Sequence, residues 1–132
     1  HPIRREGIDR KALRGVLEVL RQGNTLIIFP EGTRTPDGSL QEGKPGVAMI
    51  AAQAGAPIVP VFIDGSFRAM PRGAAWPRPV KVQIYFGQPF PPDFSDPEDG
   101  ATPRRGRYDR LAAEIMERIR QTAPDRSRPS GA

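Results

Sequence analysis

The order of amphipathic and apolar segments constrains the fold of this 132-residue chain more than any other feature. A helical pattern over residues 9–22 is followed by a short apolar run, Thr25–Phe29. A second helical pattern, from Pro45 to Ala54, is followed by another apolar run, Ile58–Ile63. Neither run alternates with polar residues, which is typical of strands buried on both faces of a parallel sheet. The order therefore predicts an α/β fold with a mostly parallel sheet flanked by helices.

The middle of the chain predicts a long loop and a less buried strand. Residues 64–79 carry several prolines and glycines and contain Trp76. The following segment, Val80–Phe86, alternates between apolar and polar residues. Alternation with period two predicts a half-exposed or edge strand. Its apolar face comprises Val80, Val82, Ile84 and Phe86.

The C-terminal third predicts one more helix. Residues 87–106 are rich in proline and acidic residues and indicate a surface connection. Apolar residues from Tyr108 onward recur at helical spacing, which predicts an amphipathic helix that ends near Gln121. We expect one domain over residues 1–122 and a disordered tail over residues 123–132. No apolar run approaches the roughly 18 residues that a transmembrane helix needs.

The composition favours an anionic partner. The net charge is +5, from 20 Lys and Arg residues against 15 Asp and Glu residues. Only three of the 20 are lysines, and the guanidinium of arginine suits bidentate contacts with phosphate or carboxylate. A basic surface attracts nucleic acid, anionic lipid headgroups or phosphorylated metabolites, although a GC-rich genome also favours arginine. There is no cysteine, so the chain offers neither disulfides nor thiolate metal ligands, and we expect no metal site.

The polar loop after Phe29 has the residue types of an anion site. In open α/β sheets, ligands bind beyond the carboxyl ends of the strands, where Glu31 to Arg34 would lie. Gly32 lets backbone amides approach an anion, and Arg34 offers a fork for phosphate oxygens. Lys44 adds a charge at the start of the second helix, and Glu31 could orient the arginines or a ligand hydroxyl. The alternative is that Glu31 and Arg34 form a solvated turn pair.

A resemblance to a known family bears on this choice. The stretch "FPEGTRTPDGSLQEGKPG" resembles a characteristic block and loop of the glycerolipid acyltransferases, the lysophosphatidic acid acyltransferase family. Three other stretches also resemble segments of that family. Together the matching text covers roughly residues 2–90, and the combination is much more specific than any one piece. The three stretches are "HPIRREGIDRKAL", "APIVPVFIDGS" and "VKVQIYFGQPF".

The resemblance implies a reaction and a set of binding residues. A fatty acyl group would move from acyl-CoA or acyl carrier protein, acting as co-substrate, to 1-acylglycerol 3-phosphate, giving phosphatidic acid. No other cofactor is implied. The arginines would bind the acceptor phosphate, and Pro60 would shape the wall near the acceptor or its acyl chain. The residues that the resemblance assigns to acceptor binding are Arg5, Glu31, Gly32, Thr33, Arg34, Lys44 and Pro60.

The same resemblance leaves the general base unassigned in this chain. Acyl transfer to an alcohol needs a base for the hydroxyl proton, and the family uses a His-x-x-x-x-Asp block. The only histidine is His1, and residue 6 is Glu6, so that spacing fails. We therefore expect an N-terminally truncated acyltransferase domain with little or no activity alone, the block lying upstream. Upstream segments are also expected to hold the enzyme on the cytoplasmic face of the membrane.

Other functions stay open at this stage. Related acceptors are glycerol 3-phosphate, other lysophospholipids and a lyso-ornithine lipid, because the FPEGTR block is shared among such enzymes. A nucleotide-binding P-loop is disfavoured because Pro45 follows Lys44 where Ser or Thr is needed. A basic nucleic-acid-binding module fits the charge but lacks an aromatic-rich strand pattern. We expect a lysophospholipid, a thioester donor and a membrane surface as partners, and no nucleic acid.

The 64–79 loop is the candidate for contact with that membrane surface. Tryptophan beside arginines suits a lipid headgroup interface. The alternative is that Trp76 packs the loop onto the sheet. The apolar candidates are Phe67, Met70 and Trp76, and the flanking bases are Arg68, Arg72 and Arg78.

Overall fold

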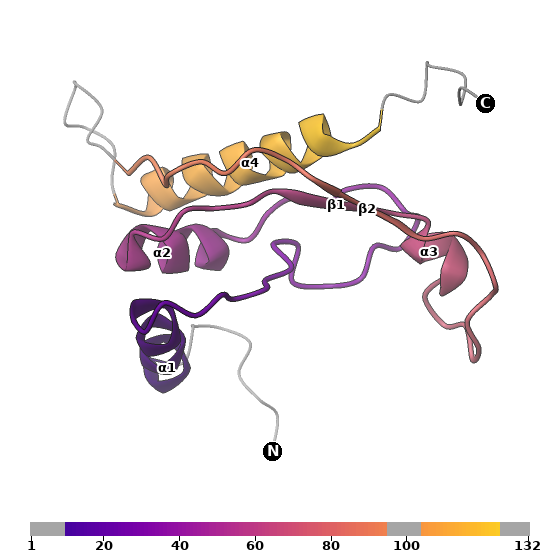
Figure 1. Cartoon of the computed structure of the whole chain (residues 1–132), viewed down its shortest axis with the longest axis horizontal. Coiled ribbons are helices and arrows are strands. Elements are labelled where there is room, and N and C mark those ends of the chain that lie inside the picture. Colours follow the sequence, from indigo (N-terminus) through magenta and orange to yellow (C-terminus); the bar gives the residue numbers. More distant parts are fainter. Residues whose placement is uncertain (1–9, 95–103, 125–132) are drawn as a thin grey trace.

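The structure, a computed structural model, describes residues 10–94 and 104–124. Most of the tail expected over residues 123–132 therefore lies outside the described residues, as do His1 and Arg5. No helix in the described ranges is long and apolar enough to cross a membrane. The elements in chain order (Figure 1) are α1 (Arg10–Arg21), α2 (Pro45–Ala54), β1 (Val61–Asp64), α3 (Ser66–Ala69), β2 (Gln83–Phe86) and α4 (Arg104–Thr122).

The three longer helices confirm the helical patterns in the sequence. In α2, Pro45 occupies the start of the helix, where its missing N–H costs no hydrogen bond. Gly55 ends the same helix in the left-handed conformation, with φ of 61°, which glycine adopts without a Cβ clash. The buried residue of α1 is Leu17, at the centre of the predicted stripe. Asp9, whose side chain is of a type that can cap a helix N-terminus, lies outside the described residues.

The core forms around one face of α4. Figure 1 shows α4 running along α2 and β1, with α1 packed on the other side of α2. Leu111 is only 2% exposed, and the buried side chains of α4 recur at helical spacing along one stripe. They enclose Ala48 of α2 and Phe90, and the guanidinium of Arg118 lies 4.6 Å from the ring centroid of Phe90. The members of the stripe are Leu111, Ala112, Ile115, Met116 and Ile119.

The sheet differs from the predicted parallel arrangement. Its two strands, β1 and β2, are antiparallel, with Phe62 opposite Tyr85, and an isolated bridge joins Ile58 to Phe90. Parallel neighbours require a long crossover, usually a helix, between them. Only the four-residue α3 and a loop separate β1 from β2, so the described connection does not provide one. The predicted strand at Ile58–Ile63 is present in part, displaced to Val61–Asp64.

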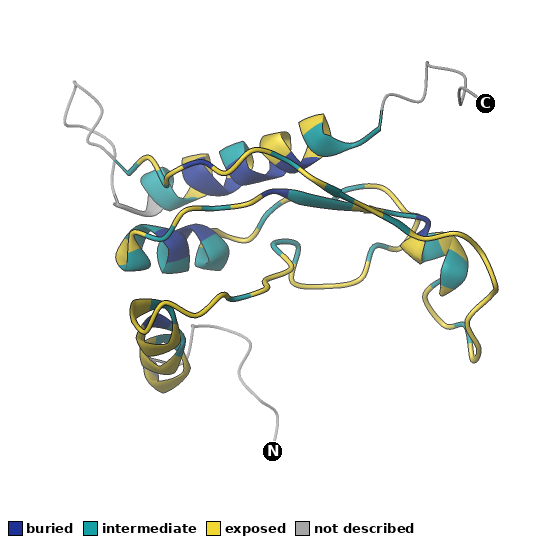
Figure 2. Ribbon diagram, in the orientation of Figure 1, coloured by how far each residue is buried: buried dark blue, intermediate teal, exposed yellow. Residues whose placement is uncertain are grey.

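The run Thr25–Phe29 is not a strand, which corrects the sequence-based prediction. Ile27 is 82% exposed and Phe29 is 68% exposed, so the face that they share lies in solvent, and on the other face Leu26 and Ile28 are not fully buried. A strand exists only where a neighbour completes its hydrogen-bond ladder. Within the described residues no strand pairs with this run. Figure 2 shows it as an exposed segment that leads away from α1.

The predicted strand Val80–Phe86 is present only over Gln83–Phe86, where burial alternates, but its apolar face points outward. Gln83 and Tyr85 are half-buried, whereas Ile84 is exposed and Phe86 is 73% exposed. The register places Ile63 opposite Ile84, so both lie on the same outer face. The inner face contacts α4 through β1. The described sheet is therefore covered by a helix on one side only.

We expect Leu111→Ala to lower the free energy of unfolding by about 2–5 kcal/mol, because it opens a cavity in the core. Ile27→Ala should change that free energy by less than about 0.5 kcal/mol, because the side chain is already in water. Urea unfolding followed by circular dichroism measures both. Equal losses in the two variants would contradict the exposed placement of residues 25–29.

Candidate functional site

The polar loop predicted to carry the chemistry is closed at its base. The N–H of Lys44 donates to the carbonyl of Pro30 at 2.8 Å. Leu40 packs against the core, and Gly43 lies so close to α4 that a Cβ there would stand 2.8 Å from Cγ of Met116. The loop is therefore a compact structure with near ends, fixed on the core. We call residues 30–44 the polar loop.

Gly32 and Lys44 come together where the polar loop meets α2. The N–H of Gly32 donates to the carbonyl of Phe29 at 3.1 Å, and this turn gives Gly32 a φ of 65°. Residues with a Cβ rarely adopt that φ, which explains the glycine. A Cβ at Gly32 would lie 3.4 Å from Cγ of Lys44. The stem of Lys44 thus lies beside the turn, at the N-terminal end of α2, where helix amides favour anions.

The carboxylate of Glu31 is engaged within the polar loop. Its Oε2 accepts the backbone N–H of Gln41 at 2.8 Å, in a part-buried contact. This bond crosses the loop and stabilises its closed shape. The predicted pairing of Glu31 with Arg34 does not occur, either as an orienting contact or as a solvated turn pair. Glu31 therefore shapes the loop through Gln41, a partner that no local pattern in the sequence indicates.

A second carboxylate, Asp37, organises the tip of the polar loop. Its Oδ1 accepts the N–H and the hydroxyl of Ser39, at 2.9 and 2.6 Å, and the hydroxyl of Thr35 at 3.2 Å. The hydrogen bonds from Ser39 lower the pKa of Asp37 below its ordinary value. Gly38, beside it, lies against the ring of Phe67 in α3. The Pro-Asp-Gly sequence at 36–38 is a known turn signal that could have revealed this network.

Arg34 connects the polar loop to the next loop in the chain. Its NH2 donates to the carbonyl of Met70 at 2.5 Å and, less closely, to that of Pro71 at 3.5 Å. A guanidinium has five N–H donors, so Nε and NH1 remain. Among the described residues these two nitrogens have no acceptor. Arg34 is exposed and can therefore hold a backbone and an anionic ligand at the same time.

The polar loop exposes cations while its turn carboxylates are engaged. Glu31 and Asp37 accept hydrogen bonds from their own loop, and Arg34 and Lys44 are exposed to solvent. Glu42, the third carboxylate of the loop, is exposed as well, so an approaching anion would meet both attractive bases and repulsive carboxylates, two of which are held in place by hydrogen bonds. Thr33 is also exposed. Arg5 lies outside the described residues, so the structure says nothing of its place.

Pro60 lies in a different part of the molecule. It is buried, its carbonyl accepts the N–H of Gly87 at 2.9 Å, and it lines an open groove of about 740 Å³ between β2 and the end of α4. No residue of the polar loop lines this groove. The lining residues are Pro60, Ile84, Tyr85, Phe86, Gly87, Gln88, Arg118, Gln121 and Thr122.

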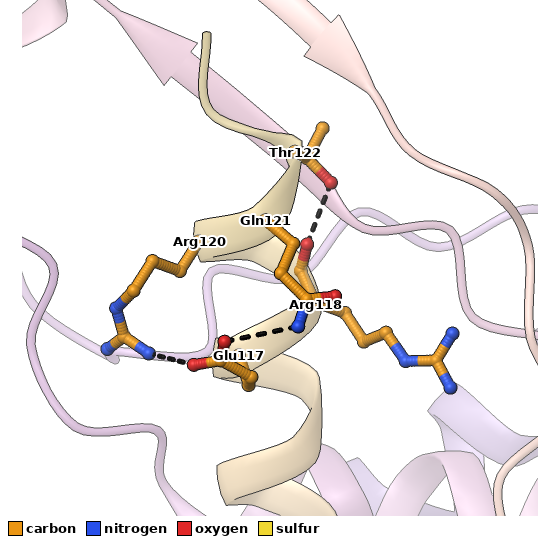
Figure 3. Close-up of polar contacts among 5 residues, drawn as sticks. All are labelled: Glu117, Arg118, Arg120, Gln121 and Thr122. Carbon is orange, nitrogen blue, oxygen red and sulfur yellow. Dashed lines mark hydrogen bonds and ion pairs between the residues drawn. The ribbon is translucent and has the colours of Figure 1, made fainter. Parts of the chain in front are cut away.

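The helical wall of this groove is held by short-range polar contacts. In Figure 3, Glu117 accepts hydrogen bonds from Arg120 and Gln121, and Arg118 extends away from this group. The hydroxyl of Thr122 donates to the carbonyl of Arg118 at 2.8 Å. These contacts order the end of α4 and give the groove a polar edge beside its apolar strand residues. No group of three His, Cys, Asp or Glu residues in the described ranges could hold a metal ion.

Comparisons with known proteins agree on one family. Residues 1–64 match the family model described as acyltransferase. A 1-acyl-sn-glycerol-3-phosphate acyltransferase of Chlamydomonas reinhardtii is 30% identical over 116 residues, which are 87% of this chain and 35% of that protein. A chloroplastic 1-acyl-sn-glycerol-3-phosphate acyltransferase of Brassica napus is 40% identical over 62 residues, which are 47% of this chain and 18% of that protein.

The fold is also similar to a solved structure. The crystal structure of the 1-acyl-sn-glycerophosphate acyltransferase PlsC from Thermotoga maritima superposes with a TM-score of 0.66 at 33% identity. The match covers 85% of this chain and 44% of that one. The chain thus spans less than half the length of each of these three relatives.

The hydrogen bonds at the loop tip predict a pH dependence. Because the pKa of Asp37 is lowered in the folded chain, its contribution to loop order is present above the unfolded value of about 3.9 and is lost as pH falls through the lower folded value. We expect Ser39→Ala to raise that pKa toward the ordinary value. Carbon-13 NMR titration of the Asp37 carboxyl measures it, with Ser66→Ala as control. An unchanged pKa in Ser39→Ala would contradict the assignment of Ser39 as main donor.

Proposed function

The chain belongs to the acyltransferase family, as the match over residues 1–64 and the acyltransferase relatives show, and from this we propose a function. We propose that it supplies the acceptor-binding part of a 1-acylglycerol-3-phosphate acyltransferase. That enzyme would transfer a fatty acyl group from acyl-CoA or acyl carrier protein to the free hydroxyl of 1-acylglycerol 3-phosphate. The product would be phosphatidic acid.

The observation that supports this proposal most is the charge arrangement of the polar loop. Arg34 and Lys44 are exposed, and the carboxylates of Glu31 and Asp37 are engaged by donors of the same loop. Helix amides at the start of α2 add positive potential beside Lys44. A phosphate suits a guanidinium and an ammonium that are carried by one loop beside a helix N-terminus. We propose that Arg5 adds a further contact to that phosphate.

The proposed chemistry assigns binding, and not proton abstraction, to these residues. The acceptor hydroxyl oxygen would bond to the thioester carbonyl carbon, the C–S bond would break, and the thiol would leave. The hydroxyl proton would pass to a general base, which would hand it to the leaving sulfur to give the thiol. The only histidine of the sequence is His1, which lacks the His-x-x-x-x-Asp spacing. We propose that the base comes from a His-x-x-x-x-Asp block outside these 132 residues.

The groove beside Pro60 offers a place for an apolar chain. Its wall combines Pro60 with exposed Ile84 and Phe86, and its volume is about 740 Å³. Acyl chains bind along apolar surface, because burial of each CH₂ contributes about 0.8 kcal/mol. We propose that this groove takes the acyl chain of the acceptor or donor. A glycerol 3-phosphate, another lysophospholipid or a lyso-ornithine lipid acceptor remains the alternative.

Acyl transfer from labelled acyl-CoA to lysophosphatidic acid tests the function. The assay is run on this chain and on an N-terminally extended version that includes a His-x-x-x-x-Asp block. We expect phosphatidic acid only from the extended version. Activity of the 132-residue chain itself would overturn the assignment of the base. Transfer to another acceptor in place of lysophosphatidic acid would overturn the proposed substrate.

Substitution of Arg34 tests the phosphate contact directly. We expect Arg34→Ala to weaken binding of monomeric lysophosphatidic acid on the order of 10- to 100-fold, the range for a lost charge-assisted hydrogen bond. Arg34→Lys should recover only part, because lysine cannot hold the Met70 carbonyl and a phosphate with one planar fork. Titration calorimetry measures this, with Arg14→Ala on α1 as charge-matched control and monoacylglycerol as the ligand without phosphate. Full recovery in Arg34→Lys would show that charge alone suffices.

A further inference from the structure

The segment that follows β1 carries an excess of positive charge. From residue 65 to residue 92 there are four basic residues and no acidic one. The nearest carboxylates along the chain are Asp64 and Asp93. All four bases are exposed, so this excess of charge faces solvent. The four are Arg68, Arg72, Arg78 and Lys81.

Apolar side chains are exposed between these bases. Trp76 is 82% exposed, which decides against its packing on the sheet. Met70, Val80 and Val82 are also exposed. Exposed tryptophan with neighbouring arginines is the composition that binds at a lipid headgroup boundary, where the ring enters the interface and the cations meet phosphate. A surface that contacts only water does not favour such a cluster of exposed apolar side chains.

The backbone gives this segment a defined shape. The N–H of Arg78 donates to the carbonyl of Ala69 at 2.6 Å and closes a loop over residues 70–77, and the N–H of Ala74 donates to the carbonyl of Pro71 at 3.0 Å. Closed loops of this size present their tips as compact units. Figure 1 shows the loop beside α3, at the end of the molecule opposite α1 and α2. It can therefore meet a flat surface without obstruction by those helices.

We propose that α3 and the loop after it, residues 66–82, form a docking surface for an anionic lipid bilayer. We call this the 66–82 surface. The exposed cations select anionic headgroups. Each arginine at the membrane surface raises the affinity roughly fivefold. Trp76 and the exposed valines add apolar contact with the acyl boundary. Both contributions are needed, because a single weak signal gives only marginal, reversible membrane binding.

The docking surface is joined to the polar loop by Arg34 and by Phe67. Arg34 donates to the carbonyls of Met70 and Pro71 at the base of the surface, and Gly38 lies against the ring of Phe67. A lipid acceptor that leaves the bilayer at residues 66–82 would meet Arg34 first. This last step rests on the proposed function, whereas bilayer docking does not, since phosphatidylglycerol is neither acceptor nor product of that reaction.

Trp76 is the only tryptophan of the chain, so its fluorescence reports on this surface alone. The probe is vesicles of phosphatidylcholine with a minority of phosphatidylglycerol, and vesicles of pure phosphatidylcholine. With the anionic vesicles we expect a blue shift of the Trp76 emission, protection from acrylamide and quenching by brominated lipid. Raised salt should weaken the binding, because exposed charges are screened. If the protein sediments with the vesicles while the Trp76 emission stays unchanged, the chain docks through another surface.

Matched variants separate the local surface from net charge and general hydrophobicity. Arg72→Gln with Arg78→Gln should lower affinity for anionic vesicles about 25-fold in co-sedimentation. Arg14→Gln with Arg21→Gln on α1 removes the same charge elsewhere and should have little effect. Trp76→Ala should weaken sedimentation, and Ile27→Ala, which removes an equally exposed apolar side chain, should not.

Three further outcomes would overturn the proposal. Equal losses in the two arginine pairs would mean that binding follows net charge and not the 66–82 surface. Equal binding to neutral and anionic vesicles would remove the role of the cations. Salt-sensitive binding to duplex DNA, lost in Arg72→Gln with Arg78→Gln and without vesicle binding, would assign the surface to nucleic acid. Circular dichroism of each variant confirms that helix content is kept.

Discussion

The burial of one stripe on α4 holds the described structure together. Leu111, Ile115 and Met116 close over Ala48 of α2, over Phe90 and over the inner face of β1. The same stripe anchors the polar loop, because Leu40 packs on this core and Gly43 lies against Met116. Apolar burial is the main favourable term in folding, so the loops depend on a core that they do not themselves form. The position of the candidate site is thus set by a helix more than 60 residues later in the sequence.

Hydrogen bonds to backbone atoms then fix the geometry of the candidate site on this core. Pro30 and Lys44 close the polar loop, Glu31 spans it, and Arg34 extends from it to Met70. Each charged side chain that bonds a backbone group has part of its hydrogen-bonding capacity fixed, which reduces its freedom before any ligand arrives. Preorganised cations bind an anion with less loss of side-chain entropy than mobile ones. The loop is therefore suited to recognition of a small anionic group.

The longer helices were predictable from sequence and the sheet only in part, for a physical reason. Helical hydrogen bonds are local, so spacing of apolar residues and the signals at Pro45 and Gly55 suffice to place α2. Strands depend on partners distant in sequence, and Thr25–Phe29 has the composition of a buried strand without a described neighbour to pair with. The strand order was wrong for a related reason. A parallel pair needs a crossover, and nothing in the pattern of residues 64–79 revealed that the chain turns back through α3 instead.

The candidate site shows the same division between local and distant contacts. The anion site at positions 31–44 stays a prediction from residue types, and the turn at Asp37 follows from Pro-Asp-Gly, but no local rule pairs Arg34 with Met70. That contact joins positions 36 residues apart and depends on both loops being placed by the core. It also gives Arg34 a structural contact that the sequence does not indicate. A side chain that holds the base of an exposed, cationic loop through NH2 keeps Nε and NH1, and our proposals use these two nitrogens for the phosphate of a lipid that the 66–82 surface captures. Lysine has neither the planarity nor the number of donors for both tasks, so the proposed role of position 34 depends on the geometry of two loops and not on charge alone.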